Sequence, residues 1–292
     1  MIEIDGKTMT CGLLGNPVEH TMSPAIHNTL AKLLGHSLVY VPFLVDQGKL
    51  EQAVYGARAL HIKGLNVTVP YKTEVMQYAT ELDPLAAQIG AVNTLVETDT
   101  GYKGYNTDMP GLYRAMLSEG IRIEGEKVIV LGAGGAARAV CFLLAFHKAE
   151  KVYLLNRTLD KAQKIAEEVN GYLGKELVVP MALQDYGKLP CEKMLAIQAT
   201  SVGLSPHDEE VVIDEPAFYE RVHTGYDLIY RPLETKFMKC VKNAGGVAYH
   251  GLKMLLYQGI IAYELWNQVS VSEEQAEVVY QAMKNAMGIT EI

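Results

Sequence analysis

A glycine-rich turn between a hydrophobic run and a helix-like run constrains the fold of this chain more than any other feature. Gly132-Ala133-Gly134-Gly135-Ala136-Ala137 fits the pattern G-x-G-x-x-A, after the apolar run 127–131 and before the helical pattern 136–147. The first glycine permits a tight turn, the second lets a pyrophosphate approach the backbone, and the small third residue lets helix and strand pack closely. The helix N-terminus then offers free N–H groups to a phosphate. This context predicts a dinucleotide-binding unit, with a glycine-rich turn that binds nothing as the alternative.

The hydrophobic pattern changes near residue 108, which predicts two domains. Before that point we expect short strands at 9–14, 38–43, 65–69, 91–97 and 102–105, and helices at 23–34, 47–60 and 72–79. After it we expect strands at 127–131, 151–155, 177–179, 194–198 and 226–229, and helices at 110–119, 136–147 and 159–169. Ser23 is expected to cap the first helix with its hydroxyl. Two tail helices follow, one over 251–266 and one capped at Ser272 with Gln275 completing a capping box.

The predicted fold class is therefore α/β with two domains. Residues 1–108, completed by the C-terminal helices 251–292, form an N-terminal mixed α/β substrate domain, and residues 109–250 form a Rossmann-type parallel-sheet domain that binds a dinucleotide. Strands that alternate with helices imply a parallel sheet covered on both faces. We expect the active site in the cleft between the domains, with domain closure excluding water.

Charge and cysteine usage exclude some classes of partner. The chain has 292 residues and a net charge of −8, which argues against nucleic acid or an anionic membrane as the main partner. Its four cysteines are far apart and form no CxxC pair, so neither a zinc site nor a disulfide framework is indicated. We expect a cytoplasmic protein, monomeric or homodimeric, that binds a small molecule and no metal.

The end of the second Rossmann strand favours NADP over NAD. An NAD-binding protein usually places a carboxylate there for the ribose hydroxyl, whereas this chain has Asn156-Arg157-Thr158, with Lys161 one turn later. Two cations at this position would hold a 2′-phosphate through charge-assisted hydrogen bonds. The alternative is an ordinary solvated basic helix start.

Four segments of the first domain place amides, hydroxyls or ionisable groups at strand ends and turns, where sites on α/β folds usually lie. The first runs from Gly15-Asn16-Pro17 to His20-Thr21-Met22-Ser23-Pro24. The second is Gly64-Leu65-Asn66-Val67-Thr68-Val69-Pro70-Tyr71-Lys72. The others are Gly90-Ala91-Val92-Asn93-Thr94 and Gly104-Tyr105-Asn106-Thr107-Asp108.

Taken together with the glycine loop, these segments resemble the shikimate dehydrogenase family over nearly the whole chain. The resemblance implies reversible NADP-dependent reduction of 3-dehydroshikimate to shikimate, in the pathway to chorismate and the aromatic amino acids. It implies that Lys72 and Asp108 are the catalytic pair, acting jointly as acid/base and orienting groups. Taken singly, Lys72 also fits an exposed lysine at a helix start, and Asp108 fits a helix cap.

The resemblance also assigns binding residues. Thr21 and Ser23 would hold the substrate carboxylate at a helix N-terminus, which favours an anion. The expected partners of the ring oxygens are Asn66, Thr68, Asn93, Tyr230 and Gln258, with a pair of internally satisfied buried amides as the alternative for Asn66 and Asn93. The expected cofactor-binding residues are Gly132, Ala133, Gly134, Gly135, Ala136, Asn156, Arg157, Thr158, Lys161, Thr200, Gly251 and Met254. His20 and His27 are interpreted as structural.

Two departures from the family pattern leave alternatives open. Thr21 stands where members commonly have serine, and its methyl group is compatible with a quinate/shikimate dehydrogenase that also uses NAD. Gln198 stands where asparagine is more common. A non-catalytic sensor of the same fold is a further alternative, against which the retention of both Lys72 and Asp108 argues.

Overall fold

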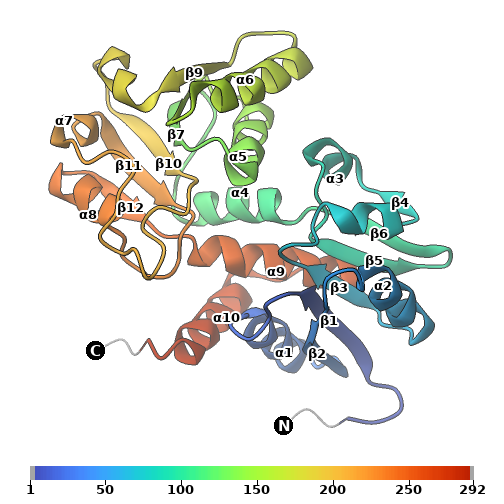
Figure 1. Cartoon of the computed structure of the whole chain (residues 1–292). Helices are drawn as coiled ribbons and strands as arrows, with labels where there is room; N and C mark the ends of the chain where they lie inside the picture. The colour runs from blue at the N-terminus through green and yellow to red at the C-terminus, as the bar shows by residue number, and fades with distance from the viewer. Residues whose placement is uncertain (1–3, 290–292) are drawn as a thin grey trace. The chain divides into compact units, whose positions relative to one another are not determined.

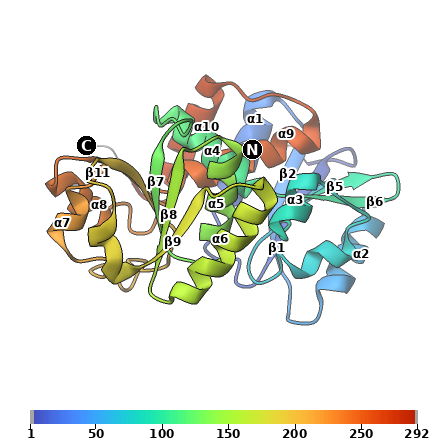
Figure 2. The same ribbon diagram turned by 90° about the horizontal axis from the view of Figure 1, so that it is seen from above.

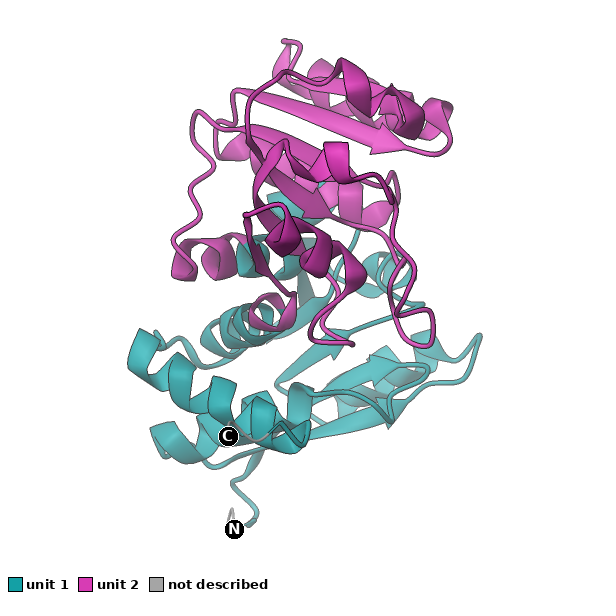
Figure 3. Ribbon diagram, turned by 90° about the vertical axis from the view of Figure 1, so that its left-hand side faces the viewer, with its two compact units in different colours: residues 1–112, 255–292 teal, residues 113–254 magenta. Residues whose placement is uncertain are grey.

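The structure is a computed structural model that describes residues 4–289. The chain divides into two compact units, coloured separately in Figure 3. Unit 1 joins the residues up to Leu112 to those from Leu255 onward, and unit 2 is the single stretch Tyr113–Met254. The chain passes between the units within two helices, α4 (Asp108–Ser118) and α9 (Leu252–Asn267).

Unit 1 is built on a mixed six-stranded sheet in the order β2-β1-β3-β5-β6-β4. Its strands are β1 (Met9–Gly15), β2 (Leu38–Leu44), β3 (Gly64–Val67), β4 (Glu81–Leu82), β5 (Thr94–Thr98) and β6 (Gly101–Tyr105). β1 pairs in parallel with both β2 and β3, whereas β5 runs antiparallel to β3 and to β6. β5 and β6 form a hairpin joined by Asp99 and Thr100, and the N-terminal unit is mixed α/β as expected.

Helices from both ends of the chain complete unit 1. They are α1 (Ser23–Leu34), α2 (Leu50–Ala59), the 3₁₀ helix η1 (Glu74–Tyr78), α3 (Pro84–Ile89), and α10 (Glu273–Ala286) together with most of α9. Figure 1 shows α10 beside α1, and these two helices are in contact. The Trp266 indole donates to the Leu95 carbonyl at 3.0 Å, over Gly64, where a side chain would leave the indole no room. The tail helix α9 is thereby fixed against the sheet.

Unit 2 has a parallel six-stranded sheet in the order β12-β11-β10-β7-β8-β9. Its strands are β7 (Lys127–Leu131), β8 (Lys151–Asn156), β9 (Val178–Ala182), β10 (Met194–Gln198), β11 (Val222–Asp227) and β12 (Val247–Tyr249). Counted along the unit, this is the doubly wound order 3-2-1-4-5-6 of a Rossmann fold. The predicted Rossmann-type parallel sheet is confirmed.

Helices cover both faces of this sheet, as Figure 2 shows for α5 and α6 on one side and α7 and α8 on the other. Their bounds are α5 (Gly135–Phe146), α6 (Leu159–Leu173), η2 (Leu183–Lys188), α7 (Pro216–Tyr219) and α8 (Lys236–Asn243). Both faces of β7 are buried, and Ile129 and Leu131 face a core that contains Phe218 and Phe237. A strand buried on both faces accounts for the continuous apolar run in the sequence.

Three local predictions are wrong. Ser23 does not cap α1, since the N-cap is Met22 without a side-chain bond; the Thr21 hydroxyl instead accepts from the Ser23 amide at 3.2 Å. The helix expected at 72–79 is a 3₁₀ helix beginning at Glu74. The strand expected at 226–229 lies instead at Val222–Asp227. It ends at Asp227, whose carboxylate accepts a hydrogen bond from the Ile229 amide at 3.0 Å. The capping box at Ser272 and Gln275 is confirmed. No helix among residues 4–289 is long and apolar enough to cross a bilayer.

Candidate active site

The two candidate catalytic residues of unit 1 are paired. Lys72 lies between β3 and η1, and Asp108 is the first residue of α4. The Lys72 ammonium donates to Asp108 Oδ2 at 2.7 Å, and the two side chains keep 33% and 24% of their surface exposed. The pair is therefore formed in the protein and still open to a ligand. Neither the exposed-lysine nor the helix-cap alternative accounts for this pairing.

Asn93 links the elements that carry this pair. Its Oδ1 accepts from the Thr107 amide at 2.7 Å, from the Thr107 hydroxyl at 3.2 Å and from the Thr94 hydroxyl at 3.1 Å. The residue before it, Val92, donates its amide to the Lys72 carbonyl at 2.8 Å. Because its oxygen is turned inward, the Asn93 Nδ2 group is left as the outward donor, and it makes no hydrogen bond within the described chain.

Asn66 lies beneath Asn93 and uses its whole side-chain amide within the protein. Its Oδ1 accepts from the Tyr40 hydroxyl at 2.8 Å and lies 3.1 Å from His27 Nε2. Its Nδ2 donates to the Thr94 hydroxyl at 3.2 Å and to the Asn93 carbonyl at 3.4 Å. Oδ1 and Nδ2 of Asn66 thus each have two hydrogen-bond partners within the protein. This arrangement matches the alternative given for Asn66 from the sequence, a buried amide whose hydrogen bonds are satisfied internally.

Thr21, Ser23 and Thr68 present hydroxyl groups around the start of α1 and the end of β3. The Thr21 hydroxyl donates to the Ser23 hydroxyl at 3.2 Å, so the two predicted carboxylate ligands are neighbours. The Thr68 methyl group lies over Gly15, at the end of β1. The Thr68 hydroxyl makes no hydrogen bond to any residue between 4 and 289, which leaves it available to a ligand.

Gln258 lies on α9, in the part of that helix that belongs to unit 1. It is 8% exposed, and its Nε2 donates to the Leu255 carbonyl one turn earlier at 2.8 Å. A Cβ added at Gly111 of α4 would lie 2.6 Å from the Gln258 amide nitrogen. Only glycine at 111 allows α4 and α9 to approach this closely.

In unit 2 the glycine loop has the geometry that a pyrophosphate site requires. Gly132 has φ 111°, and its amide donates to the Leu155 carbonyl at 2.8 Å; a Cβ there would lie 2.6 Å from the Thr200 methyl group. Gly134 is the N-cap of α5, and a Cβ at Gly134 or Gly135 would meet nothing within 4 Å. The α5 N-terminus is thus open to an approaching phosphate.

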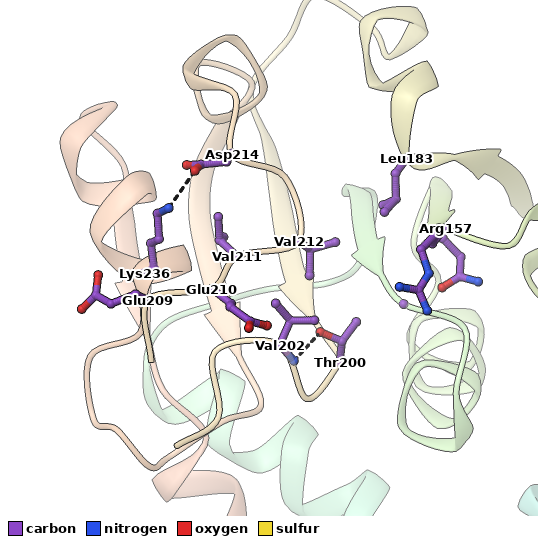
Figure 4. A pocket seen from close by; sticks show the side chains of 12 residues that line it. Arg157, Leu183, Thr200, Val202, Glu209, Glu210, Val211, Val212, Asp214 and Lys236 are labelled. Carbon is purple, nitrogen blue, oxygen red and sulfur yellow. Dashed lines mark hydrogen bonds and ion pairs between the residues drawn. The ribbon is translucent and has the colours of Figure 1, made fainter. Parts of the chain in front are cut away.

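A cavity of about 610 Å³ lies beside this loop (Figure 4). Gly132, Asn156, Arg157 and Thr200 line it, with Lys236 on the far side in an ion pair of 2.7 Å with Asp214. The remaining lining residues are Leu183, Val202, Glu209, Glu210, Val211 and Val212. The cavity has the size of many ligand sites and joins apolar walls to a few polar groups.

The predicted 2′-phosphate residues stand at the end of β8 and the start of α6. The Asn156 amide donates to the Thr158 carbonyl at 2.8 Å, which shapes the turn. Arg157, Thr158 and Lys161 are exposed, and neither cation forms an ion pair within the described part of the chain. These residues fit NADP, because two free cations and an open helix N-terminus suit its phosphates.

Gln198 has a structural role in this chain. It is completely buried, accepts the Thr200 amide at 2.6 Å and donates to the Val202 carbonyl at 3.0 Å. It also lies 3.4 Å from Asp227, whose second oxygen accepts from Thr235 at 2.6 Å. Burial raises the pKa of Asp227 to about 6. Gln198 therefore shapes the 199–202 turn of the nucleotide cavity.

The three remaining predicted residues lie in unit 2. Tyr230 is half-buried and follows β11 by three residues. Gly251 is buried, and its amide donates to the Ile229 carbonyl at 2.9 Å where a side chain would collide with the Leu228 backbone. Met254 is half-buried in the first turn of α9.

Sequence reasoning missed several residues of these sites. In unit 1 it missed the buried partners of the two asparagines, namely Tyr40, Thr94 and Thr107. In unit 2 it missed the loop carrying Glu209 and Glu210 and the Asp214–Lys236 pair. Only the position of Thr94 and Thr107 inside already noted segments carried a signal. Among residues 4–289, no three His, Cys, Asp or Glu side chains gather as a metal site would require.

A doubly wound sheet, an open glycine loop with two free cations, and a separate unit with a lysine–aspartate pair define the class: a dinucleotide-binding α/β protein of the dehydrogenase type. Comparison with known proteins agrees. Residues 13–95 match the shikimate dehydrogenase substrate binding domain, and residues 115–201 match shikimate / quinate 5-dehydrogenase. The chain belongs to the shikimate dehydrogenase family.

Individual relatives cover almost the whole chain. Shikimate dehydrogenase (NADP(+)) of Desulforamulus reducens is 42% identical over 265 residues, which is 90% of this chain and 91% of the relative. The solved shikimate 5-dehydrogenase of Thermus thermophilus, in complex with NADP(H) and shikimate, is 32% identical, with a TM-score of 0.82 over 94% of this chain and 100% of that one. The Listeria monocytogenes enzyme, in complex with shikimate and NAD, is 30% identical, with a TM-score of 0.87 over 95% and 97%.

Proposed function

We propose that this chain is an enzyme that catalyses the reversible, NADP-dependent reduction of 3-dehydroshikimate to shikimate, a step toward chorismate and the aromatic amino acids. The observation that carries the proposal is the 2.7 Å pair of Lys72 and Asp108 within unit 1. Family membership and relatives named for NADP support it. Without the pair, the same fold would support binding alone.

The proposed substrate site lies in unit 1, which we propose as the substrate-binding unit. Thr21 and Ser23 bind the carboxylate, where two neighbouring hydroxyls meet the N-terminus of α1. The free Thr68 hydroxyl and the outward Nδ2 of Asn93 bind ring hydroxyls, and Gln258 and Tyr230 are their proposed companions. Asn66 supports these groups from behind, because its own amide is already fully bonded.

The proposed chemistry places a proton at Lys72 Nζ. The glycine loop and Arg157 of unit 2 would hold NADPH, which would supply the hydride for the ring carbonyl carbon and leave the carbonyl π electrons on its oxygen. Lys72 donates a proton to that oxygen, which completes the alcohol, and solvent later restores the proton. Asp108 accepts a hydrogen bond from the Lys72 ammonium and holds it in place, so that the lysine also stabilises the developing oxyanion.

The proposed NADP site lies in unit 2. Gly132–Ala136 face the pyrophosphate, and the cluster of Asn156, Arg157, Thr158 and Lys161 binds the 2′-phosphate. Thr200, Gly251 and Met254 complete the proposed set. The buried, unlinked thiols of Cys11 and Cys141 support a reducing compartment, and we propose the cytoplasm.

One observation favours a second activity. Thr21 stands where family members commonly carry serine, and its hydroxyl donates to the Ser23 hydroxyl at 3.2 Å. This supports quinate as a second substrate, and the Listeria relative crystallised with NAD keeps NAD open as a second cofactor.

A crossed steady-state assay tests the proposal. Purified protein is given shikimate or quinate, each with NADP or NAD, and NADP affinity is measured separately by fluorescence. Turnover mainly with shikimate and NADP is the expected result. Quinate with NAD as the best pair would reassign the enzyme, and NADP binding without turnover of any pair would leave only the sensor alternative.

A further inference from the structure

His27 is a buried imidazole that the proposed mechanism does not use. It lies on α1 with no exposed surface, stacks on the Tyr40 ring at 4.2 Å and lies 4.9 Å from the Trp266 ring. Gly259 of α9 packs against this part of α1, where an added Cβ would lie 3.1 Å from the Ile26 side chain and 3.7 Å from His27 Nε2. Burial lowers the pKa of His27 to about 3, so the ring is neutral at physiological pH and carries one N–H.

The partners of Asn66 decide which nitrogen of His27 carries that proton. The Asn93 carbonyl can only accept a hydrogen bond, so the Asn66 amide nitrogen faces it, at 3.4 Å. Asn66 Oδ1 then faces His27 Nε2 and the Tyr40 hydroxyl, and both must donate to it. Burial raises the pKa of Tyr40 far above its usual range, which keeps its proton in place. His27 Nδ1, with no partner in the described chain, is left as a bare lone pair.

The Asn66 amide in turn fixes the groups above it. It donates to the Thr94 hydroxyl at 3.2 Å, and Thr94 donates to Asn93 Oδ1 at 3.1 Å. Thr107, which binds the same oxygen, directly precedes Asp108. If the Asn66 amide turned over, its oxygen would face the Asn93 carbonyl and draw the Thr94 proton away from Asn93. The two donors to Asn66 Oδ1 prevent this.

We infer that His27 is a positioning residue for the substrate site: its neutral imidazole donates from Nε2 to Asn66 and, through Thr94, holds the Asn93 amide with its nitrogen toward the substrate. The inference rests on the proposed function, because it takes Asn93 as the ligand of a ring hydroxyl. It replaces the purely structural role that the sequence indicated for His27. Its effect belongs to shikimate binding, since the network lies in unit 1 and the nucleotide residues lie in unit 2.

The experiment compares His27→Leu with His27→Gln. Glutamine keeps an N–H donor near the position of Nε2, whereas leucine keeps only the apolar volume. We expect His27→Leu to raise the KM for shikimate about tenfold, the equivalent of one lost hydrogen bond, with the KM for NADP changed less than about twofold. His27→Gln is expected to recover most of the loss. Circular dichroism and NADP affinity verify that each variant is folded.

Two results would overturn the inference: an unchanged shikimate KM in folded His27→Leu, or an equal loss in both variants, which would indicate packing. If His27→Leu does not fold, Tyr40→Phe removes the other donor to the same oxygen and must raise the shikimate KM selectively; failure to do so overturns the inference as well. A wild-type enzyme without shikimate turnover would instead refute the proposed function, and the inference with it.

Discussion

Lys72 Nζ and Asp108 Oδ2 lie 2.7 Å apart, although the strands β4, β5 and β6 lie between the two residues in the chain. Lys72→Ala is expected to lower kcat about a hundred- to ten-thousand-fold, because it removes the proton donor and oxyanion partner. Asp108→Asn keeps a hydrogen bond without the charge and should fall between this variant and the wild type. Steady-state rates with shikimate and NADP measure both, with NADP affinity as the control. A Lys72→Ala enzyme that keeps most of its kcat would remove lysine from the mechanism.

Arg157 tests the choice of cofactor. Arg157→Ala is expected to weaken NADP binding about 10- to 100-fold, since a hydrogen bond to a charged group contributes roughly 1.5–3 kcal/mol. NAD, which has no 2′-phosphate, should bind with unchanged affinity. Lys164→Ala is the matched control, because Lys164 is an exposed cation on α6, the helix that follows Arg157, and is not among the residues that line the cavity. Equal losses for NADP and NAD would show that Arg157 does not read the phosphate.

Gly111 tests the contact between α4 and α9. A Cβ there would lie 2.6 Å from the Gln258 amide nitrogen, so Gly111→Ala is expected to cost about 1–3 kcal/mol of unfolding free energy and to raise the KM for shikimate. Gly56→Ala is the control, because Gly56 lies in the interior of α2 with open space around its Cβ position and should gain stability by roughly 0.5–1 kcal/mol. Denaturant unfolding measures both. Similar values for the two variants would contradict the close contact.

Asp227 should make stability fall with rising pH. Its pKa is about 6 in the folded protein and near 3.8 in the unfolded chain, so between these values the folded state holds a proton that the unfolded state has lost. Linkage then lowers the unfolding free energy as pH rises from about 4 to about 6, by on the order of 3 kcal/mol. Asp227→Asn should abolish this slope, as measured by urea unfolding across that range. An unchanged slope in the variant would assign it to other groups.

Replacing Thr21 tests whether its methyl group affects the choice between shikimate and quinate. Thr21→Ser keeps the hydroxyl and removes one methyl group, so it is expected to raise the shikimate-to-quinate ratio of kcat/KM by about tenfold, the usual effect of one methylene in a pocket. Competition assays with the two acids measure the ratio. A ratio that does not move would mean that the methyl group points away from the ligand.

The sequence predicted the Rossmann unit well because its signals are local. The glycine loop, the buried β-branched strands and the Ser272 capping box each require only neighbouring residues, and each was confirmed. The N-cap of α1 was wrong because Thr21, Met22 and Ser23 all lie within one residue of the boundary, and backbone geometry decides among them. The short β4, α3 and β12 carry too few residues for a periodic pattern.

In the candidate site, too, residues within local motifs could be named from the sequence, whereas contacts between distant segments could not. Lys72 and Asp108 were named from family motifs, whereas their hydrogen bond depends on β5 and β6 bringing distant segments together. The inner partners of Asn66 could not be predicted, because His27, Tyr40 and Thr94 come from three elements separated in the chain and joined only by the sheet. Which group donates and which accepts in these hydrogen bonds can be decided only from the positions of the atoms in the fold. The role of His27 could therefore not be predicted from the sequence.

Because Trp266 contacts Leu95 and Gly64, unit 1 can complete its packing only after the C-terminal helices have been synthesised. Unit 2 is one continuous stretch, so a ribosome delivers all of it before the last layer of unit 1 has been made. Until α9 has been synthesised, the face of the unit 1 sheet over Gly64 stays uncovered. During that interval the nascent chain holds all of unit 2 and an uncovered apolar surface in unit 1, and surfaces of that kind make partly folded chains prone to aggregation.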